Sequence, residues 1–181
     1  SDEERVRRLE EEVDKTLEKV ERELRKVSEE NKRTLDRLRA EMEKSSKELE
    51  RVLEELNIDE ELRKEIKRRN DELRKELEEL LTRNRKKDED LKRRAEKLKR
   101  EIERLKEELK RELEDLKRKG SDERDVERTL RKIEETVKKL AEDLKRLLDE
   151  IKKISEESKR RAEELLRKHK KIVDDIDKRT R

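Results

Sequence analysis

The chain has no cysteine, proline, phenylalanine, tyrosine or tryptophan, and it has only one glycine among its 181 residues. The absence of cysteine excludes disulfide bonds, thiolate catalysis and sulfur-ligated metals. Without aromatic side chains, the protein has no rings on which nucleic-acid bases could stack. Proline and glycine break helices most strongly, so their near absence favours long uninterrupted helices.

Long apolar runs are also absent, because no more than two apolar residues stand next to one another. Such a sequence cannot supply a helix that spans a membrane, so no membrane partner is expected. The first four residues contain no apolar segment, so we expect no signal peptide. The sequence therefore predicts a soluble protein and carries no signal that assigns it a cellular location.

Charged residues make up 64% of the chain and hydrophobic residues only 26%, against about 25% and 45–50% in ordinary globular proteins. The 59 basic and 56 acidic residues are closely interleaved and leave a net charge of +3. No basic stripe stands out, so a nucleic-acid partner is not expected. Pairs such as Glu134 with Lys138, four residues apart, are expected to lie on exposed helix faces. Two classes of chain fit this composition: a disordered polyampholyte and a bundle of long helices.

The apolar residues distinguish these classes, because they recur every three or four positions and also repeat every eighteen residues. The repeat includes Val6, Leu24 and Met42; Leu17, Leu35 and Leu53; Val20, Leu38 and Leu56; Leu62, Leu80, Leu98 and Leu116; Leu73, Leu91 and Leu109; and Leu130, Leu148 and Leu166. Eighteen residues in five turns correspond to about 3.6 residues per turn, the value of an undistorted helix. The pattern therefore predicts helices that are nearly straight.

Two short breaks divide the chain into three helices, expected at about residues 2–56, 59–119 and 122–180. The first break contains Asn57, which tolerates the left-handed conformation that ends many helices, and Asp59, a strong N-cap. Ile58 between them is expected to fold back over the end of the core. The second break contains Gly120, at a position where helices commonly end. Ser1, followed three residues later by a glutamate, has the spacing of a capping box.

Breaks this short make consecutive helices antiparallel neighbours. The sequence thus predicts an all-α protein: one up-down-up antiparallel three-helix bundle over residues 1–181, with helices of about 85 Å. One core of this kind uses nearly all the apolar residues, which favours a monomer without a partner. The third helix has the widest apolar stripe, through Ala141, Leu148, Leu166 and Val173. Self-association or binding of partner helices along that stripe is the alternative.

Several positions on the apolar seams carry polar residues instead. When helix midpoints are aligned with the second helix reversed, these residues gather at two heights separated by roughly 25 Å. The central group is Asn31, Thr34, Asn84, Asp88, Ser155 and Ser158, and the other is Ser45, Asn70 and His169. Each group draws on all three helices.

A buried polar group without a partner costs about 1–3 kcal/mol, so clustering has a physical reason. We interpret the two groups as hydrogen-bond networks that fix helix register, because a polar layer penalises misalignment that an all-leucine seam tolerates. The alternative is that these residues are scattered, partly exposed and satisfied by water or by their own helix. Thr16, Thr129 and Thr136 have no obvious polar residue opposite, so each is expected to bond to its own helix.

The only histidine, His169, is interpreted as a structural residue. One histidine without cysteine or a Glu-x-x-His pair gives no metal site, so neither a metal nor a cofactor is expected. No catalytic residue was identified, and an enzyme is not expected. As a secondary hypothesis, protonation of a neutral buried His169 would destabilise the bundle below about pH 6.

In its eighteen-residue repeat, its two short turns, its Glu/Lys/Arg surface and its Asn/Ser/Thr/His layers, the whole chain resembles de novo designed helical bundles. Such bundles are built from parametric helix equations around buried hydrogen-bond networks. The resemblance implies a stable scaffold, or a component of oligomers and switches, with no natural substrate. A natural spectrin-like repeat or a lipid-binding apolipoprotein is a further alternative. The former usually carries core tryptophans and the latter a broader apolar face, and the sequence has neither.

Overall fold

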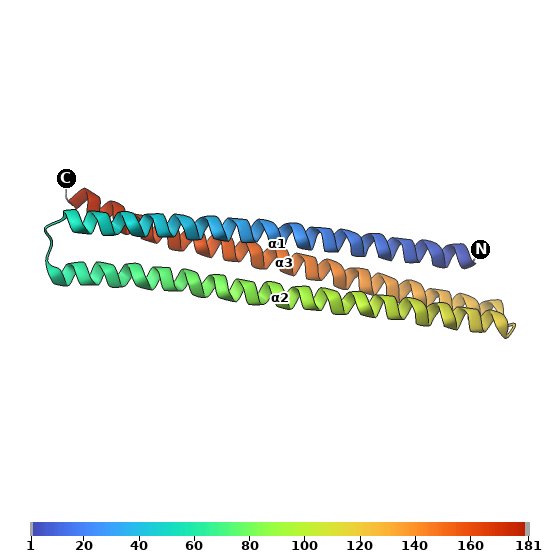
Figure 1. Ribbon diagram of the computed structural model, residues 1–181. Coiled ribbons are helices and arrows are strands. Elements are labelled where there is room, and N and C mark those ends of the chain that lie inside the picture. Colours follow the sequence, from blue (N-terminus) through green and yellow to red (C-terminus); the bar gives the residue numbers. More distant parts are fainter. Residues whose placement is uncertain (1, 180–181) are drawn as a thin grey trace. The chain divides into compact units, whose positions relative to one another are not determined.

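The computed structural model describes residues 2–179 and contains three α-helices in this range: α1 (Asp2–Glu55), α2 (Glu60–Arg118) and α3 (Glu123–Arg179) (Figure 1). No strand is present in the described part of the chain. The predicted all-α three-helix bundle is confirmed, and the observed helix ends lie within one residue of the predicted ones. The capping box predicted for Ser1 lies outside the described residues.

Residue contacts group the chain into two compact units, and each unit contains a part of all three helices. The first unit consists of the chain up to Lys26 together with Glu89–Lys152. The second unit consists of Val27–Asp88 together with the chain from Lys153 onward. Each unit has its own apolar core.

The core of the first unit contains two clusters of buried side chains. In one cluster, Val13 of α1 packs with Ile102 of α2 and Leu144 of α3. In the other, residues near the start of α1 and α3 meet the end of α2, as Val6 meets Leu113. Because low residue numbers in α1 lie beside high residue numbers in α2, these helices are antiparallel within the unit.

The core of the second unit also contains two clusters of buried side chains. Met42 of α1 packs with Leu77 of α2 and Leu165 of α3, and all three are at most 2% exposed. A further cluster at the end of α1 includes Leu53 and is covered by Ile58. The prediction that Ile58 folds back over the core is therefore confirmed.

Most residues of the eighteen-residue repeat lie in these cores, and the exception is the class on α2 that begins with Leu62. Leu62 is 40% exposed and is the one exposed large hydrophobic residue of the described chain. Leu80, Leu98 and Leu116 of the same class are half-buried. This class therefore lies at the edge of the core rather than at its centre.

The turn between α1 and α2 differs from its prediction at Asn57. Within the described residues, no residue other than glycine has a positive φ, so Asn57 does not adopt the left-handed conformation that asparagine tolerates. The end of α1 is instead capped from the next helix, where Arg63 Nη2 donates a hydrogen bond to the Leu56 carbonyl at 3.1 Å. That side-chain bond satisfies a terminal carbonyl, which removes the need for a left-handed residue.

The turn between α2 and α3 has the conformation that its glycine predicts. Gly120 has φ 63°, the left-handed region that glycine enters without steric cost. The Ser121 amide donates to the Leu116 carbonyl at 3.1 Å and the Gly120 amide to the Lys117 carbonyl at 3.3 Å. This pair of bonds forms a Schellman motif that closes α2.

Candidate functional site

A buried polar layer in the second unit joins all three helices. His169 of α3 is completely buried, and Ser45 and Ser46 of α1 and Asn70 of α2 are 7%, 2% and 4% exposed. Ser45 Oγ lies 2.7 Å from His169 Nδ1, and Ser46 Oγ lies 3.3 Å from Nε2. Ser46 also donates to Asn70 Oδ1 at 3.0 Å, and that same oxygen contacts His169 Nε2. The structure thus brings together the predicted group of Ser45, Asn70 and His169 and adds Ser46.

The hydrogen-bond partners show which of the two ring nitrogens of His169 carries the proton. Asn70 Oδ1 can only accept, so the His169 Nε2 that contacts it carries the proton. His169 Nδ1 is then an acceptor, and Ser45 donates its hydroxyl hydrogen to it. Both ring nitrogens are therefore satisfied when the ring is neutral.

Burial lowers the pKa of His169 below its usual 6.5, and the positive charge of Arg74 on α2 lowers it further. Arg74 is itself paired with Glu43 of α1 at 2.6 Å. The four residues of the layer include no carboxylate that would compensate a charged imidazolium. The folded protein therefore favours a neutral ring.

Acidification is expected to destabilise the protein through this ring. The unfolded chain binds a proton near pH 6.5, whereas the folded chain resists it, so the free energy of unfolding falls as the pH drops below about 6.5. For one group the slope is at most about 1.4 kcal/mol per pH unit. Denaturation at a series of pH values from 8 to 5 would measure it. His169→Gln should remove this slope, and a slope that survives in the variant would assign it to other groups.

The predicted central group occurs as separate pairs. Ser158 of α3 donates to Asn84 of α2 at 2.8 Å, and both residues are buried. Asp88 accepts from Ser28 at 3.0 Å. The other three members are half-buried and make no side-chain hydrogen bond to any described residue, so solvent remains their available partner. These members are Asn31, Thr34 and Ser155.

Sequence reasoning missed Ser28 and Ser46, although a signal for both was present. They lie eighteen residues apart on α1, and their partners Asp88 and Asn70 lie eighteen residues apart on α2. A hydrogen bond from a serine of α1 to a side-chain oxygen of α2 therefore occurs twice, at positions one eighteen-residue repeat apart. Neither serine belongs to an apolar repeat class, because position 10 of their class is a glutamate, but their eighteen-residue spacing was itself a signal.

Two of the three threonines expected to bond to their own helix do so. Thr16 donates to the Glu12 carbonyl at 2.9 Å and Thr136 to the Lys132 carbonyl at 2.8 Å. Thr129 is buried but makes no side-chain hydrogen bond to another described residue. For Thr129, the prediction is wrong.

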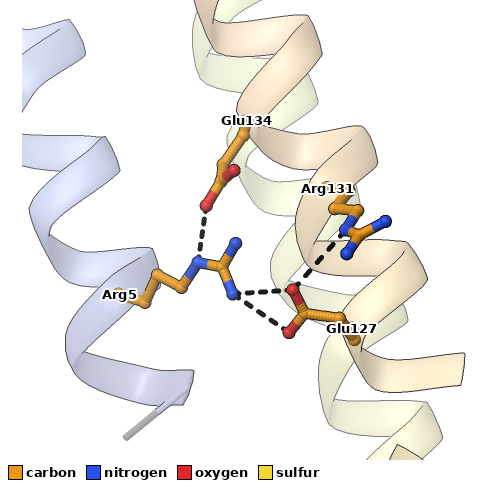
Figure 2. A network of polar contacts seen from close by, with 4 residues as sticks. All are labelled: Arg5, Glu127, Arg131 and Glu134. Atoms are coloured by element: carbon orange, nitrogen blue, oxygen red, sulfur yellow. Dashed lines mark hydrogen bonds and ion pairs between the residues drawn. The ribbon is translucent and has the colours of Figure 1, made fainter. Parts of the chain in front are cut away.

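A second polar network, in the first unit, lies on the surface and joins the start of α1 to α3 (Figure 2). Arg5 Nε donates to Glu134 at 2.5 Å, and Arg5 Nη1 donates to both carboxylate oxygens of Glu127 at 3.0 and 3.1 Å. Arg131 of α3 also pairs with Glu127, at 3.6 Å. The Arg5 hydrogen bond lowers the pKa of Glu134, and the two glutamates raise the pKa of Arg5.

Glu134 was predicted to pair with Lys138 on its own helix, but its ion pair is with Arg5 of another helix. Several more ion pairs join different helices within one unit. They include Arg39 with Glu78, Arg94 with Glu150, Lys99 with Glu21, Lys110 with Glu10, Lys152 with Glu23 and Arg161 with Glu76. Because most of these side chains are about half exposed, solvent screens the pairs and each contributes little to stability.

Among residues 2–179, no group of three or more His, Cys, Asp or Glu residues is placed to hold a metal ion. None of the three described helices is apolar over enough of its length to traverse a membrane. Searches with protein-family models, curated proteins and solved structures found no match for this chain. The class that the described structure defines is an all-α three-helix bundle with hydrogen-bonded polar side chains in its core.

Proposed function

We propose that the protein is a designed structural scaffold whose buried polar layers fix the register of its helices and which has no natural substrate. The observation that carries this proposal is the layer of Ser45, Ser46, Asn70 and His169. Its four side chains come from three helices, are each less than a tenth exposed and satisfy one another.

The physical argument concerns helix sliding. Apolar side chains attract one another without directional preference, so a seam of leucines loses little when one helix shifts by a turn. A shift of α1 would carry Ser46 away from Asn70 and would leave His169 Nδ1 without the Ser45 hydroxyl. Each buried polar group left without a partner costs about 1–3 kcal/mol. The layer therefore favours one alignment over the others.

Ser45, His169 and Asn70 are hydrogen-bonded in the order serine, histidine, amide, which is the connectivity of some hydrolase triads. Catalysis would also need donors for a developing oxyanion and access for a substrate. Ser45 lies in the middle of α1, where the backbone amides are engaged in helical hydrogen bonds, and the His169 ring is completely buried. We therefore propose a structural role for the layer, without enzymatic activity.

A monomer is part of the proposal. The apolar stripe of α3 was the reason to consider a partner, but its Leu148, Leu166 and Val173 are 8%, 5% and 6% exposed. Among the described large hydrophobic side chains, Leu62 alone is exposed. No contiguous apolar face therefore favours the alternative of an assembly module.

Replacement of the whole layer by apolar residues tests the register role. The variant Ser45→Ala, Ser46→Ala, Asn70→Leu, His169→Leu leaves no polar group unpaired, so it should fold with stability near that of the parent. Spin labels at the exposed positions Lys47 of α1 and Lys75 of α2, introduced through cysteine, report register within the second unit. We expect one narrow distance distribution in the parent and several distances in the variant.

Sedimentation equilibrium on both proteins completes the test, with 22.4 kDa expected for the parent. An equally narrow distance distribution in the variant would show that apolar packing alone sets register and would overturn the proposed role. A mass clearly above that of one chain for the parent would instead support the assembly module.

A further inference from the structure

A surface groove of about 420 Å³ lies between α1 and α3 in the second unit. Its volume falls in the range of about 300–1,000 Å³ that is typical of sites for small molecules. Charged side chains of both signs line it, including Lys44 and Glu48 of α1 and Lys170 and Asp174 of α3. Because neither sign dominates, the groove suits a neutral small molecule better than a strongly charged one.

Ser45 is the residue that this groove shares with the buried polar layer. It lines the groove and is 7% exposed, whereas His169 is completely buried. Ser46, which contacts the same ring, is 2% exposed and does not line the groove. A small molecule in the groove therefore meets Ser45, while the imidazole behind it stays shielded from solvent.

The contacts of Ser45 are those of an activated nucleophile. Its Oγ lies 2.7 Å from His169 Nδ1, which is free to accept a proton because Nε2 carries the hydrogen that faces Asn70. A hydroxyl within about 2.6–3.2 Å of a base that a third group orients is the arrangement that activates serine. Burial and the charge of Arg74 lower the pKa of His169, so the ring is a free base at neutral pH.

We propose that Ser45 is a site of covalent acylation by small neutral activated esters, with His169 as its general base and Asn70 as a positioning residue. Ser45 Oγ forms a bond to the acyl carbon of the ester as its hydrogen moves to His169 Nδ1. The bond from the acyl carbon to the leaving oxygen breaks, and the leaving oxygen takes the proton from Nδ1. The products are acylated Ser45 and one alcohol, and the ring is neutral again.

The reaction stops after a single acyl group. An activated ester has a good leaving group, but the alkoxide of Ser45 is a poor one, so release of the acyl group depends on donors that stabilise an oxyanion. The backbone amides around Ser45 are engaged within α1, and the ring that would activate water is completely buried. Acylation without turnover is therefore compatible with the structural role proposed above and does not rest on it.

The probe is p-nitrophenyl acetate, and mass spectrometry of peptides from the full chain measures acetylation at each serine. Hydroxylamine removes acetyl groups from serine but not from lysine amides, which separates the two products. Ser155 is the internal control, because it is half-buried and makes no side-chain hydrogen bond to a described residue. A positioned general base contributes about 10²–10⁴-fold, and restricted access to Ser45 offsets part of this.

We therefore expect Ser45 to be acetylated at least about tenfold faster than Ser155 in the folded protein, and at a similar rate in denaturant. Equal rates at the two serines in the folded protein, or no acetylation of Ser45, would overturn the proposal. This comparison uses the parent chain alone, so it holds even if a variant does not fold.

Two variants test the role of the ring, with circular dichroism as the check that both are folded. His169→Gln removes the base but keeps a polar side chain, so acetylation of Ser45 should fall to the rate of Ser155. Ser46→Ala leaves the hydrogen bond from Ser45 to His169 in place and should react as the parent does. An unchanged rate in His169→Gln, or an equal loss in both variants, would contradict the role of His169 as the base.

Discussion

Replacement of Leu165 by alanine is expected to lower the free energy of unfolding by about 2–5 kcal/mol. Leu165 is 1% exposed and packs in the second unit among large side chains such as Met42 and Leu77. Truncation removes buried methyl groups and leaves a cavity that the rigid helices cannot close, so both terms reduce stability. Chemical denaturation followed by circular dichroism would measure the change.

The control is the same substitution at Leu62, which is 40% exposed. Surface substitutions usually change stability by no more than about 0.5 kcal/mol, so Leu62→Ala should stay close to the parent. Similar losses at both positions would mean that the described burial does not represent the core of the folded protein.

Replacement of Asn70 by alanine is expected to cost about 1–3 kcal/mol. Asn70 Oδ1 accepts from Ser46 and contacts the protonated Nε2 of His169, so its removal takes the acceptor from the buried Ser46 hydroxyl and leaves Nε2–H only the longer contact to Ser46 Oγ at 3.3 Å. The loss should appear as a lower denaturation midpoint with little change in helix content.

Asn31→Ala is the matched control, because Asn31 is also an asparagine on the predicted polar seam. Asn31 is only half-buried and makes no side-chain hydrogen bond to a described residue. Its replacement should therefore change stability by less than about 0.5 kcal/mol. If the two alanine variants were equally destabilised, the hydrogen bonds of the layer would not explain the loss at Asn70.

The helices could be predicted from sequence because their ends carry local signals. Gly120 ends α2 in a left-handed conformation that hardly any other residue adopts without strain, and this feature needs no tertiary context. Asn57 carries a weaker signal, and the tertiary contact from Arg63 to the end of α1 overrides it. The contact crosses the turn over seven residues, and its formation depends on how the start of α2 folds back on the end of α1.

The polar residues could be placed on the apolar seams and along the helix axes, but not on a particular line between two helices. The repeat class puts a residue on a seam and counting from the helix midpoints gives its height, and together these grouped Ser45, Asn70 and His169, which the structure brings into contact. A hydrogen bond also requires that both side chains face the same line between helices. Asn31 has a suitable height, but its side chain makes no such bond, because rotation about the helix axis depends on packing of the whole unit.

Ion pairs between helices were unpredictable for the same reason. Arg5 directly follows three acidic residues in sequence, yet its partners are Glu127 and Glu134 of α3. The sequence did not determine on which side of α1 and α2 the third helix packs, and that choice decides which charges face each other. Local i, i+4 rules describe one helix and contain no information about its neighbours.

The proton on His169 Nε2 lies between nitrogen and the Asn70 oxygen, in a ring that is completely buried. A hydrogen in such a place exchanges with solvent only when the surrounding structure opens locally. Since the chain has one histidine, this hydrogen would give a single ring N–H resonance that needs little assignment. Its lifetime in deuterated water would report how often the helices around the layer separate under native conditions, without any denaturant or mutation.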